Sequence, residues 1–166
     1  MRTVIIGNSG SGKTWLAKRL ASKRAAPVVH LDDIFWLEGG FDAKRDPAEA
    51  AAMIRARRAG TQWIAEGVYG KLAEQFLLSA LSLVWLDIPG DTCQRRLRAR
   101  GSESKAHMAR AQSEQGLREL IEWAGSYGTR QDSSGRAAHR ALFESFNGQR
   151  VKLGSESEVL AYLEAA

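Results

Sequence analysis

Several features that would place a protein in a special class are scarce or missing here. The chain holds a single cysteine, Cys93, so no disulfide can form within it, and no spacing of cysteine and histidine is typical of a zinc site. No apolar run approaches the ~18 residues that a membrane span needs. The N-terminus lacks the apolar segment and the cleavage site of a signal peptide. We therefore expect a reduced, cytoplasmic protein without a membrane partner.

What the chain does contain is the composition of a folded globular protein. Its 166 residues are 44% hydrophobic and 26% charged, which is enough to bury one core, and we expect a single domain over 1–166. The net charge of +5 indicates an anionic partner. Arginines concentrate between residues 95 and 140. A phosphate site, a nucleic-acid surface or a solvated helical face explains such a concentration equally well.

Strand and helix patterns alternate along the chain. Short apolar runs predict strands near 3–6, 27–31, 63–65, 81–88 and 150–153. Helical spacing and capping signals predict helices near 13–24, 46–58, 71–80, 91–100 and 156–166, and two or three more between 102 and 148. Asp91 or Thr92 is the expected cap of the helix that follows Pro89-Gly90. This alternation predicts an α/β fold with a parallel sheet covered on both faces.

The segment from Gly7 to Thr14 reads GNSGSGKT and matches the phosphate-loop pattern G-x-x-x-x-G-K-[ST] in full. Such a match arises by chance in roughly one chain of this length in a hundred or fewer. It also follows a predicted strand and opens a predicted helix, as the pattern requires. Its glycines allow backbone N–H groups to point at phosphate oxygens, and the helix N-terminus adds positive charge there.

The pattern assigns a role to each residue of this loop. We expect the whole segment to bind the phosphates of ATP: Gly7, Asn8, Ser9, Gly10, Ser11, Gly12, Lys13 and Thr14. Lys13 is the catalytic residue that reaches the β- and γ-phosphates, and Thr14 offers its hydroxyl to Mg²⁺. The alternative is a glycine-rich turn with an exposed lysine, which the surrounding pattern disfavours.

Carboxylates stand at the ends of three predicted strands. Asp32 and Asp33 follow the second strand, Glu66 ends the third, and Asp87 lies near the end of the fourth. In an open α/β sheet the ligand lies beyond the carboxyl ends of the strands. Asp32 is the first candidate for a general base or a metal anchor, with Asp33 as the alternative. Glu66 is expected at a second metal position.

An aromatic, glycine-rich segment follows Asp33. It contains Phe35, Trp36 and Phe41. Three large aromatic side chains beside a phosphate site can sandwich a base or a sugar, or they can pack a flap onto the core. The sequence leaves both interpretations open.

Together these elements resemble the nucleoside-monophosphate-kinase-like group of P-loop proteins. The segments that carry the resemblance are the phosphate loop, HLDDIFW at residues 30–36, WIAEG at 63–67, LDIP at 86–89 and the arginine-rich helix that follows. The sequence is most similar to the small adenylate-kinase-related proteins labelled topology-modulation proteins. The similarity extends over roughly residues 2–100, and more loosely over the last strand and helix.

The resemblance implies a P-loop three-layer sandwich whose five parallel strands lie in the order 2-3-1-4-5. It implies a substrate flap at about 33–46 and a helical lid at about 101–148. In such kinases lid arginines close over the triphosphate and stabilise the transferring phosphoryl group. Arg96, Arg100 and Arg130 best match that catalytic role. ATP and Mg²⁺ are the implied cofactors.

One departure from adenylate kinases concerns the acceptor. Those enzymes have Asp-Gly-Phe-Pro-Arg after the third strand, whereas this chain continues from Glu66 as EGVYGK, ending at Lys71. Lysine lacks the bidentate fork of arginine, which weakens the case for AMP. The expected function is therefore ATP-dependent phosphoryl transfer to a nucleoside monophosphate or to a small hydroxylated metabolite, as in the shikimate and gluconate kinases of this architecture.

Two other functions stay open at this point. A nucleotide-dependent regulatory or nucleic-acid-binding ATPase would use the basic stretch at 95–140. It is not favoured, because no helix-turn-helix, RRM or zinc-finger pattern is present. A degenerate member that binds nucleotide without chemistry is the other alternative, and the intact Lys13-Thr14 pair argues against it.

Overall fold

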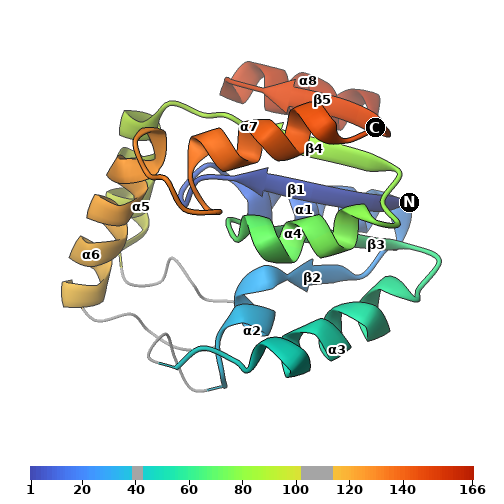
Figure 1. The fold of residues 1–166 in the computed structure, drawn as a ribbon. Coiled ribbons are helices and arrows are strands. Elements are labelled where there is room, and N and C mark those ends of the chain that lie inside the picture. The colour runs from blue at the N-terminus through green and yellow to red at the C-terminus, as the bar shows by residue number, and fades with distance from the viewer. Residues whose placement is uncertain (39–42, 102–113) are drawn as a thin grey trace.

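A computed structural model describes residues 1–38, 43–101 and 114–166 of the chain. At its centre lies a sheet of five parallel strands in the order β2-β3-β1-β4-β5 (Figure 1). The strands are β1 (Arg2–Gly7), β2 (Val28–His30), β3 (Trp63–Gly67), β4 (Ser82–Leu86) and β5 (Gln149–Leu153). The predicted α/β fold and its strand order are therefore confirmed.

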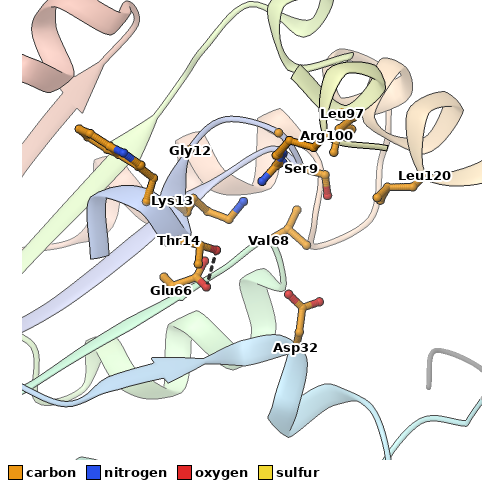
Figure 2. Close-up of a pocket in the computed structure, with 12 residues that line it drawn as sticks. Ser9, Gly12, Lys13, Thr14, Asp32, Glu66, Val68, Leu97, Arg100 and Leu120 are labelled. Atoms are coloured by element: carbon orange, nitrogen blue, oxygen red, sulfur yellow. Dashed lines mark hydrogen bonds between the residues drawn. The ribbon is translucent and has the colours of Figure 1, made fainter. Parts of the chain in front are cut away.

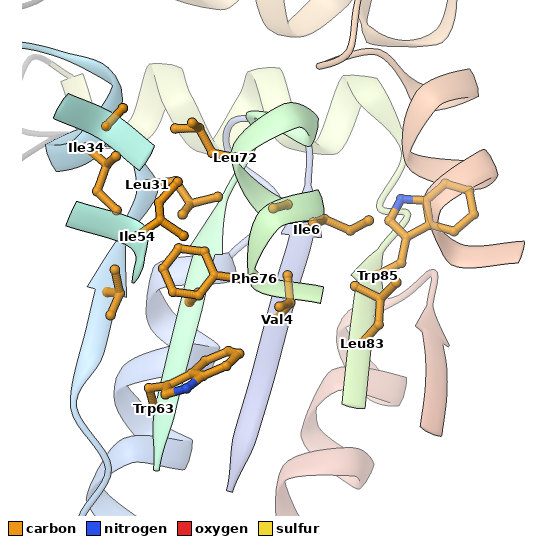
Figure 3. Close-up of a cluster of buried hydrophobic side chains, with 14 residues drawn as sticks. Val4, Ile6, Leu31, Ile34, Ile54, Trp63, Leu72, Phe76, Leu83 and Trp85 are labelled. Carbon is orange, nitrogen blue, oxygen red and sulfur yellow. The ribbon is translucent and has the colours of Figure 1, made fainter. Parts of the chain in front are cut away.

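Helices lie on both faces of the sheet because successive residues of its central strands are buried on opposite sides. Val4 and Ile6 of β1 join one apolar cluster, which Figure 3 shows, and Ile5 joins the other. The first cluster is covered by α3 (Pro47–Arg58), α4 (Gly70–Leu77) and α7 (Arg136–Ser145). The second is covered by α1 (Lys13–Arg24), α8 (Glu156–Ala165) and Cys93 of α5 (Gly90–Arg100). This two-sided burial is what parallel strands require.

The remaining helices lie at the carboxyl ends of the strands. The short α2 (Leu31–Phe35) follows β2 directly. Beyond β1 and β4, α5 and α6 (Glu114–Gly125) run side by side, and a 3₁₀ turn, η2 (Ser126–Gly128), follows α6 (Figure 1). No helix within the described ranges has both the length and the apolar composition needed to cross a bilayer.

Two local expectations differ from the structure. Leu31 to Phe35 form a helical turn, although the sequence predicted the end of a strand and a loop. Helix α5 begins at Gly90 with Pro89 as its N-cap, so the predicted cap at Asp91 or Thr92 was wrong. Asp91 instead lies in the first turn, where its carboxylate accepts from the N–H of Thr92. With the extended backbone of Pro89 as the N-cap, the helix starts two residues earlier than it would with Asp91 as the cap.

The range expected to form a lid divides into unlike parts. Residues 102–113 lie outside the described part of the chain. Helix α7 packs Leu142 and Phe143 against the first apolar cluster and so belongs to a layer of the sandwich. The lid expected at about 101–148 stays a prediction. Likewise, residues 39–42 of the expected flap, including Phe41, lie outside the described residues.

Candidate active site

The phosphate loop joins the end of β1 to the start of α1, and its shape depends on glycine. Gly10 has a φ of 81°, in the left-handed region that other residues avoid. A Cβ at Gly10 would also clash with the backbone carbonyl of Cys93 in α5. Gly12, with a φ of 98°, is the N-cap of α1. The loop can therefore follow this path only with glycine at Gly10, which places α5 directly against it.

The loop has the properties of an anion site. The N-cap Gly12 has no side chain that could cap α1, and the first turn of that helix contains no acidic residue. Ser11 is buried, and its hydroxyl has no hydrogen-bond partner among the described residues. Lys13 donates from Nζ to the backbone carbonyl of Asn8 at 2.7 Å, so its ammonium lies within the loop. Exposed helix N–H groups, a hydroxyl donor and an ammonium fit phosphate oxygens.

Glu66 brings a buried carboxylate to this loop from the end of β3. In the sheet, Glu66 stands in register beside Ile5 of β1 and His30 of β2, near the ends of those strands. The Thr14 hydroxyl donates to Glu66 Oε1 at 2.9 Å, and His30 Nδ1 donates to the same oxygen at 2.6 Å. Burial alone would raise the pKa of Glu66, but the His30 hydrogen bond and the charge of Lys13 hold it below its ordinary value.

Asp32 lies in the first turn of α2 and is hydrogen-bonded to an aromatic relay. The Tyr69 hydroxyl donates to Asp32 Oδ1 at 3.2 Å, and Trp36 Nε1 donates to that hydroxyl at 2.8 Å. The Tyr69 ring stacks on Phe35, with centroids 3.9 Å apart. Burial and the charge of Asp32 raise the pKa of Tyr69, which therefore stays a hydrogen-bond donor. Phe35 thus packs against the first apolar cluster, and Trp36 is held beside it by its hydrogen bond to Tyr69.

These side chains line one open pocket, shown in Figure 2. Its walls are Ser9, Gly10, Gly12, Lys13, Thr14 and Trp15 of the loop and α1, then Asp32, Glu66 and Val68, and finally Leu97, Arg100 and Leu120 of α5 and α6. In Figure 2 Lys13 and Thr14 point toward the space that Asp32 faces from the other side. The empty space, including solvent at its mouth, is about 530 Å³.

The three predicted lid arginines lie in different environments. Arg100 lines the pocket, where burial and the neighbouring Arg96 lower its pKa. Arg96 donates to the carbonyl of Ser11 and pairs with Glu156 of α8, both at 3.2 Å. Arg130 lies over the ring of Trp123, 3.7 Å from its centroid, and donates to two backbone carbonyls. Of the three, the pocket wall includes Arg100 alone among the described residues.

Two other predicted carboxylates have different surroundings. Asp87 forms a bidentate ion pair with Arg136, at 2.7 and 2.6 Å, and Lys152 lies 3.1 Å from it. Burial would raise the pKa of Asp87, but these two cations hold it low, so this carboxylate joins α7 and β5 to β4. Asp33 is exposed in α2, and its carbonyl accepts from Arg45. Asp32 is therefore the carboxylate of this segment that faces the pocket.

His30 and Tyr69 had no role in the sequence interpretation, although each contacts a residue that did. His30 lies one residue before α2, and Tyr69 lies three residues after Glu66. The only feature of the sequence that pointed to His30 and Tyr69 was their position near predicted strand ends. That feature could not identify them as site residues, because their hydrogen bonds to Glu66 and Asp32 join segments that are far apart in the sequence.

Mg²⁺ fits the oxygen groups of this site. The Thr14 hydroxyl, Glu66 and Asp32 offer the hard oxygen ligands that the ion prefers, and water and phosphate ordinarily complete its shell. Within the described ranges no three histidine, cysteine or acidic residues converge as a metal cluster.

The fold is similar to that of two solved structures that are kinases by name. Shikimate kinase from Bacteroides thetaiotaomicron superposes with a TM-score of 0.55 and 18% identity, over 99% of this chain and 95% of that one. A gluconokinase from Sinorhizobium meliloti 1021 gives 0.51 and 16%, over 98% and 91%. At these identities the likeness defines the fold alone. No protein-family model and no curated protein matches the sequence.

Proposed function

We propose that this protein transfers the γ-phosphoryl group of ATP to a hydroxyl group of a small metabolite. The observation that supports this most strongly is the single pocket that joins Lys13 and Thr14 to Asp32. A phosphate loop alone would serve hydrolysis, whereas a carboxylate facing it across a pocket suits an acceptor hydroxyl. Two solved structures of this fold are kinases of small hydroxylated acids by name, and they support the proposal by analogy.

The residues divide the reaction between them. Loop N–H groups and Lys13 bind the triphosphate, and Asp32 orients the acceptor hydroxyl. As the acceptor oxygen bonds to the γ-phosphorus, the bond from that phosphorus to the β-γ bridging oxygen breaks, and Asp32 takes the hydroxyl proton. Thr14 and Glu66 would hold Mg²⁺, which neutralises phosphate charge. Arg100, from the pocket wall, is the arginine best placed to stabilise the transferring group.

A nucleoside monophosphate is the less favoured acceptor. Lys71, the residue that stands where adenylate kinases have arginine, is exposed on α4 and is not part of the described pocket wall. The finer resemblance to topology-modulation proteins, a lid that begins near residue 101 and a cytoplasmic location belong to this same proposal. Roles for Arg96 and Arg130 in the closed state would require both side chains to leave their present partners.

The test is ADP formation from ATP and Mg²⁺ with a panel of sugars, polyols, hydroxy acids and nucleoside monophosphates. We expect turnover that depends on a hydroxylated acceptor. Lys13→Ala should lower kcat by a factor of 100 or more, on the order of a lost charged contact in the transition state. Lys18→Ala, at an exposed position of the same helix, is the matched control. Turnover that ignores every acceptor, or an active Lys13→Ala protein, would contradict the proposal.

A further inference from the structure

Trp15 is an unusual residue in the pocket wall. It follows Thr14 in the first turn of α1, and 42% of its surface is exposed, whereas Trp63 and Trp85 are buried in the core. It lines the same pocket as the phosphate loop. Single exposed apolar residues are ordinary at protein surfaces, but this one borders a ligand pocket. A ligand that covered the indole would remove its apolar face from water and so gain binding free energy.

The indole is held in place by its own helix. The guanidinium carbon of Arg19 lies 5.3 Å from the centroid of the Trp15 ring. Arg19 stands four residues later, so the two side chains share one face of α1. A cation over a tryptophan ring is attracted by its π-electrons, which favours one orientation of the indole. The ring is thus prearranged before any ligand binds, which lowers the entropy cost of stacking on it.

The position of Trp15 matches one end of a nucleotide. Thr14 points toward β3, where it contacts Glu66, on the side of the pocket that includes Asp32. Trp15 is the next residue of α1, so its side chain leaves the helix about 100° around the axis from that of Thr14. Gly12, the N-cap of α1, lies beside α5, since a Cβ on it would lie 3.7 Å from Arg96. A triphosphate whose γ end faces Asp32 extends its nucleoside away from that carboxylate, toward the first turn of α1, to which Trp15 belongs.

We propose that the indole of Trp15 is a stacking surface for the base of the bound nucleoside triphosphate. The inference rests on the proposed function, because it takes the loop as the triphosphate site. Stacking on an aromatic ring strengthens binding on the order of tenfold and tolerates any base, since every base has a π-face. The ring therefore makes the site bind nucleotides more tightly than inorganic polyphosphates. Among nucleotides it gives only a weak preference, for the larger purine bases.

The test compares Mg²⁺-ATP with Mg²⁺-tripolyphosphate, which has the same phosphate chain and no base, by calorimetric titration. Three proteins are needed: wild type, Trp15→Ala and Trp15→Phe. We expect Trp15→Ala to weaken ATP binding on the order of tenfold and to leave tripolyphosphate binding unchanged. Trp15→Phe should restore most of the ATP affinity, because phenylalanine keeps an aromatic face.

The outcomes separate the two proposals. Equal losses for ATP and tripolyphosphate in Trp15→Ala would mean that the ring only supports the loop, and this would overturn the stacking proposal while the phosphate site stands. Unchanged ATP affinity would also overturn it. If wild type bound neither ligand, the proposed function would fail together with the inference. A spectroscopic check is the fluorescence difference between wild type and Trp15→Phe, which ATP should quench and tripolyphosphate should not.

Discussion

Tyr69, which follows β3, links Trp36 to Asp32 through one hydroxyl group. Trp36 donates to it, and it donates in turn to Asp32. Because burial and the charge of Asp32 raise its pKa, the hydroxyl keeps its proton and cannot become an anion that repels the carboxylate. The relay therefore fixes one oxygen of Asp32. In the proposed reaction, that oxygen would set the direction from which the acceptor hydroxyl approaches.

Tyr69→Phe tests this relay while keeping the ring that stacks on Phe35. A hydrogen bond to a charged group contributes roughly 1.5–3 kcal/mol, so we expect kcat/KM to fall on the order of tenfold to a hundredfold. The loss should appear mainly in the acceptor parameters, with the KM for ATP little changed, in steady-state kinetics. Trp36→Phe removes the more distant donor and should have a smaller effect. Equal kcat/KM values in wild type and Tyr69→Phe would show that Asp32 needs no positioning.

Single residues were predictable from the sequence where their role depends on local chain geometry. Lys13 and Thr14 belong to a motif whose residue spacing alone determines the shape of the loop. Both residues line the pocket in the structure. Arg130 was selected from a run of arginines, and its location depends on Trp123 and Ser134, whose carbonyls it binds. The packing of α6 against the following turn decides that contact, and no spacing along the chain indicates it.

Four elements meet at the buried side chain of His139. Trp85 of β4 donates to the Tyr127 hydroxyl at 3.1 Å, and that hydroxyl donates to His139 Nδ1 at 2.8 Å. His139 Nε2 then donates to the carbonyl of Val68, which follows β3 and lines the pocket, at 2.8 Å. This order of donors defines the neutral tautomer with its proton on Nε2. The network ties η2 and α7 to the floor of the site.

The pH dependence of stability tests the network. Burial lowers the pKa of His139 to about 4, from 6.5 in an unfolded chain. Between these values the unfolded state binds more protons, so stability is complete above pH 6.5 and falls as pH drops toward 4. The loss from pH 7 to pH 5 should be about 2 kcal/mol, measured by urea unfolding.

His139→Gln provides the control, because glutamine has both a donor and an acceptor but no proton to gain in this range. Its free energy of unfolding should depend less steeply on pH than that of wild type, by about the same 2 kcal/mol over this interval. Parallel pH profiles for the two proteins would show that His139 does not titrate as a buried neutral group.

Element boundaries were predictable where a side chain or a proline marks them. Helices α1 and α3 have the predicted bounds, because the glycine-rich loop precedes the first and Asp46 with Pro47 begins the second. Helix α2 was missed because its five residues are too few for a helical pattern to stand out from the end of a strand. That short helix directs Asp32 toward the pocket. The missed helix therefore affects the expected position of one of the main candidate site residues.

At the scale of the whole molecule, the basic stretch that left a nucleic-acid partner open is partly used within the chain. Arg96 binds Ser11 and Glu156, Arg130 stacks on Trp123, and Arg136 pairs with Asp87. Contacts of this kind hold α5, α6 and α7 around the end of the sheet where the pocket lies. These arginines therefore have structural roles. Counting charges along the sequence could not tell such arginines from those of a nucleic-acid-binding surface.

If the phosphate loop binds a nucleotide as proposed, the same arrangement would couple that binding to the stability of the entire fold. The phosphate loop touches α5 at Gly10 and α6 through Asn8, whose side-chain amide donates to the carbonyl of Ala124 at 2.8 Å. A ligand in the loop therefore contacts segments that only the folded chain brings together, and it binds the native state alone. At a hundredfold excess over its Kd, Mg²⁺-ATP should add about 2.7 kcal/mol to the free energy of unfolding.

For a chain of this size that gain corresponds to a rise in Tm of roughly 5–10 °C in a thermal unfolding experiment. Lys13→Ala should fold with a Tm close to that of wild type without nucleotide, because its ammonium serves the ligand and not the apolar clusters. The variant should lose most of the ATP-dependent rise, and Lys18→Ala should keep it. If Lys13→Ala retained the full rise, ATP would be stabilising the protein from somewhere other than this loop, since removing the ammonium from the triphosphate site must weaken binding there.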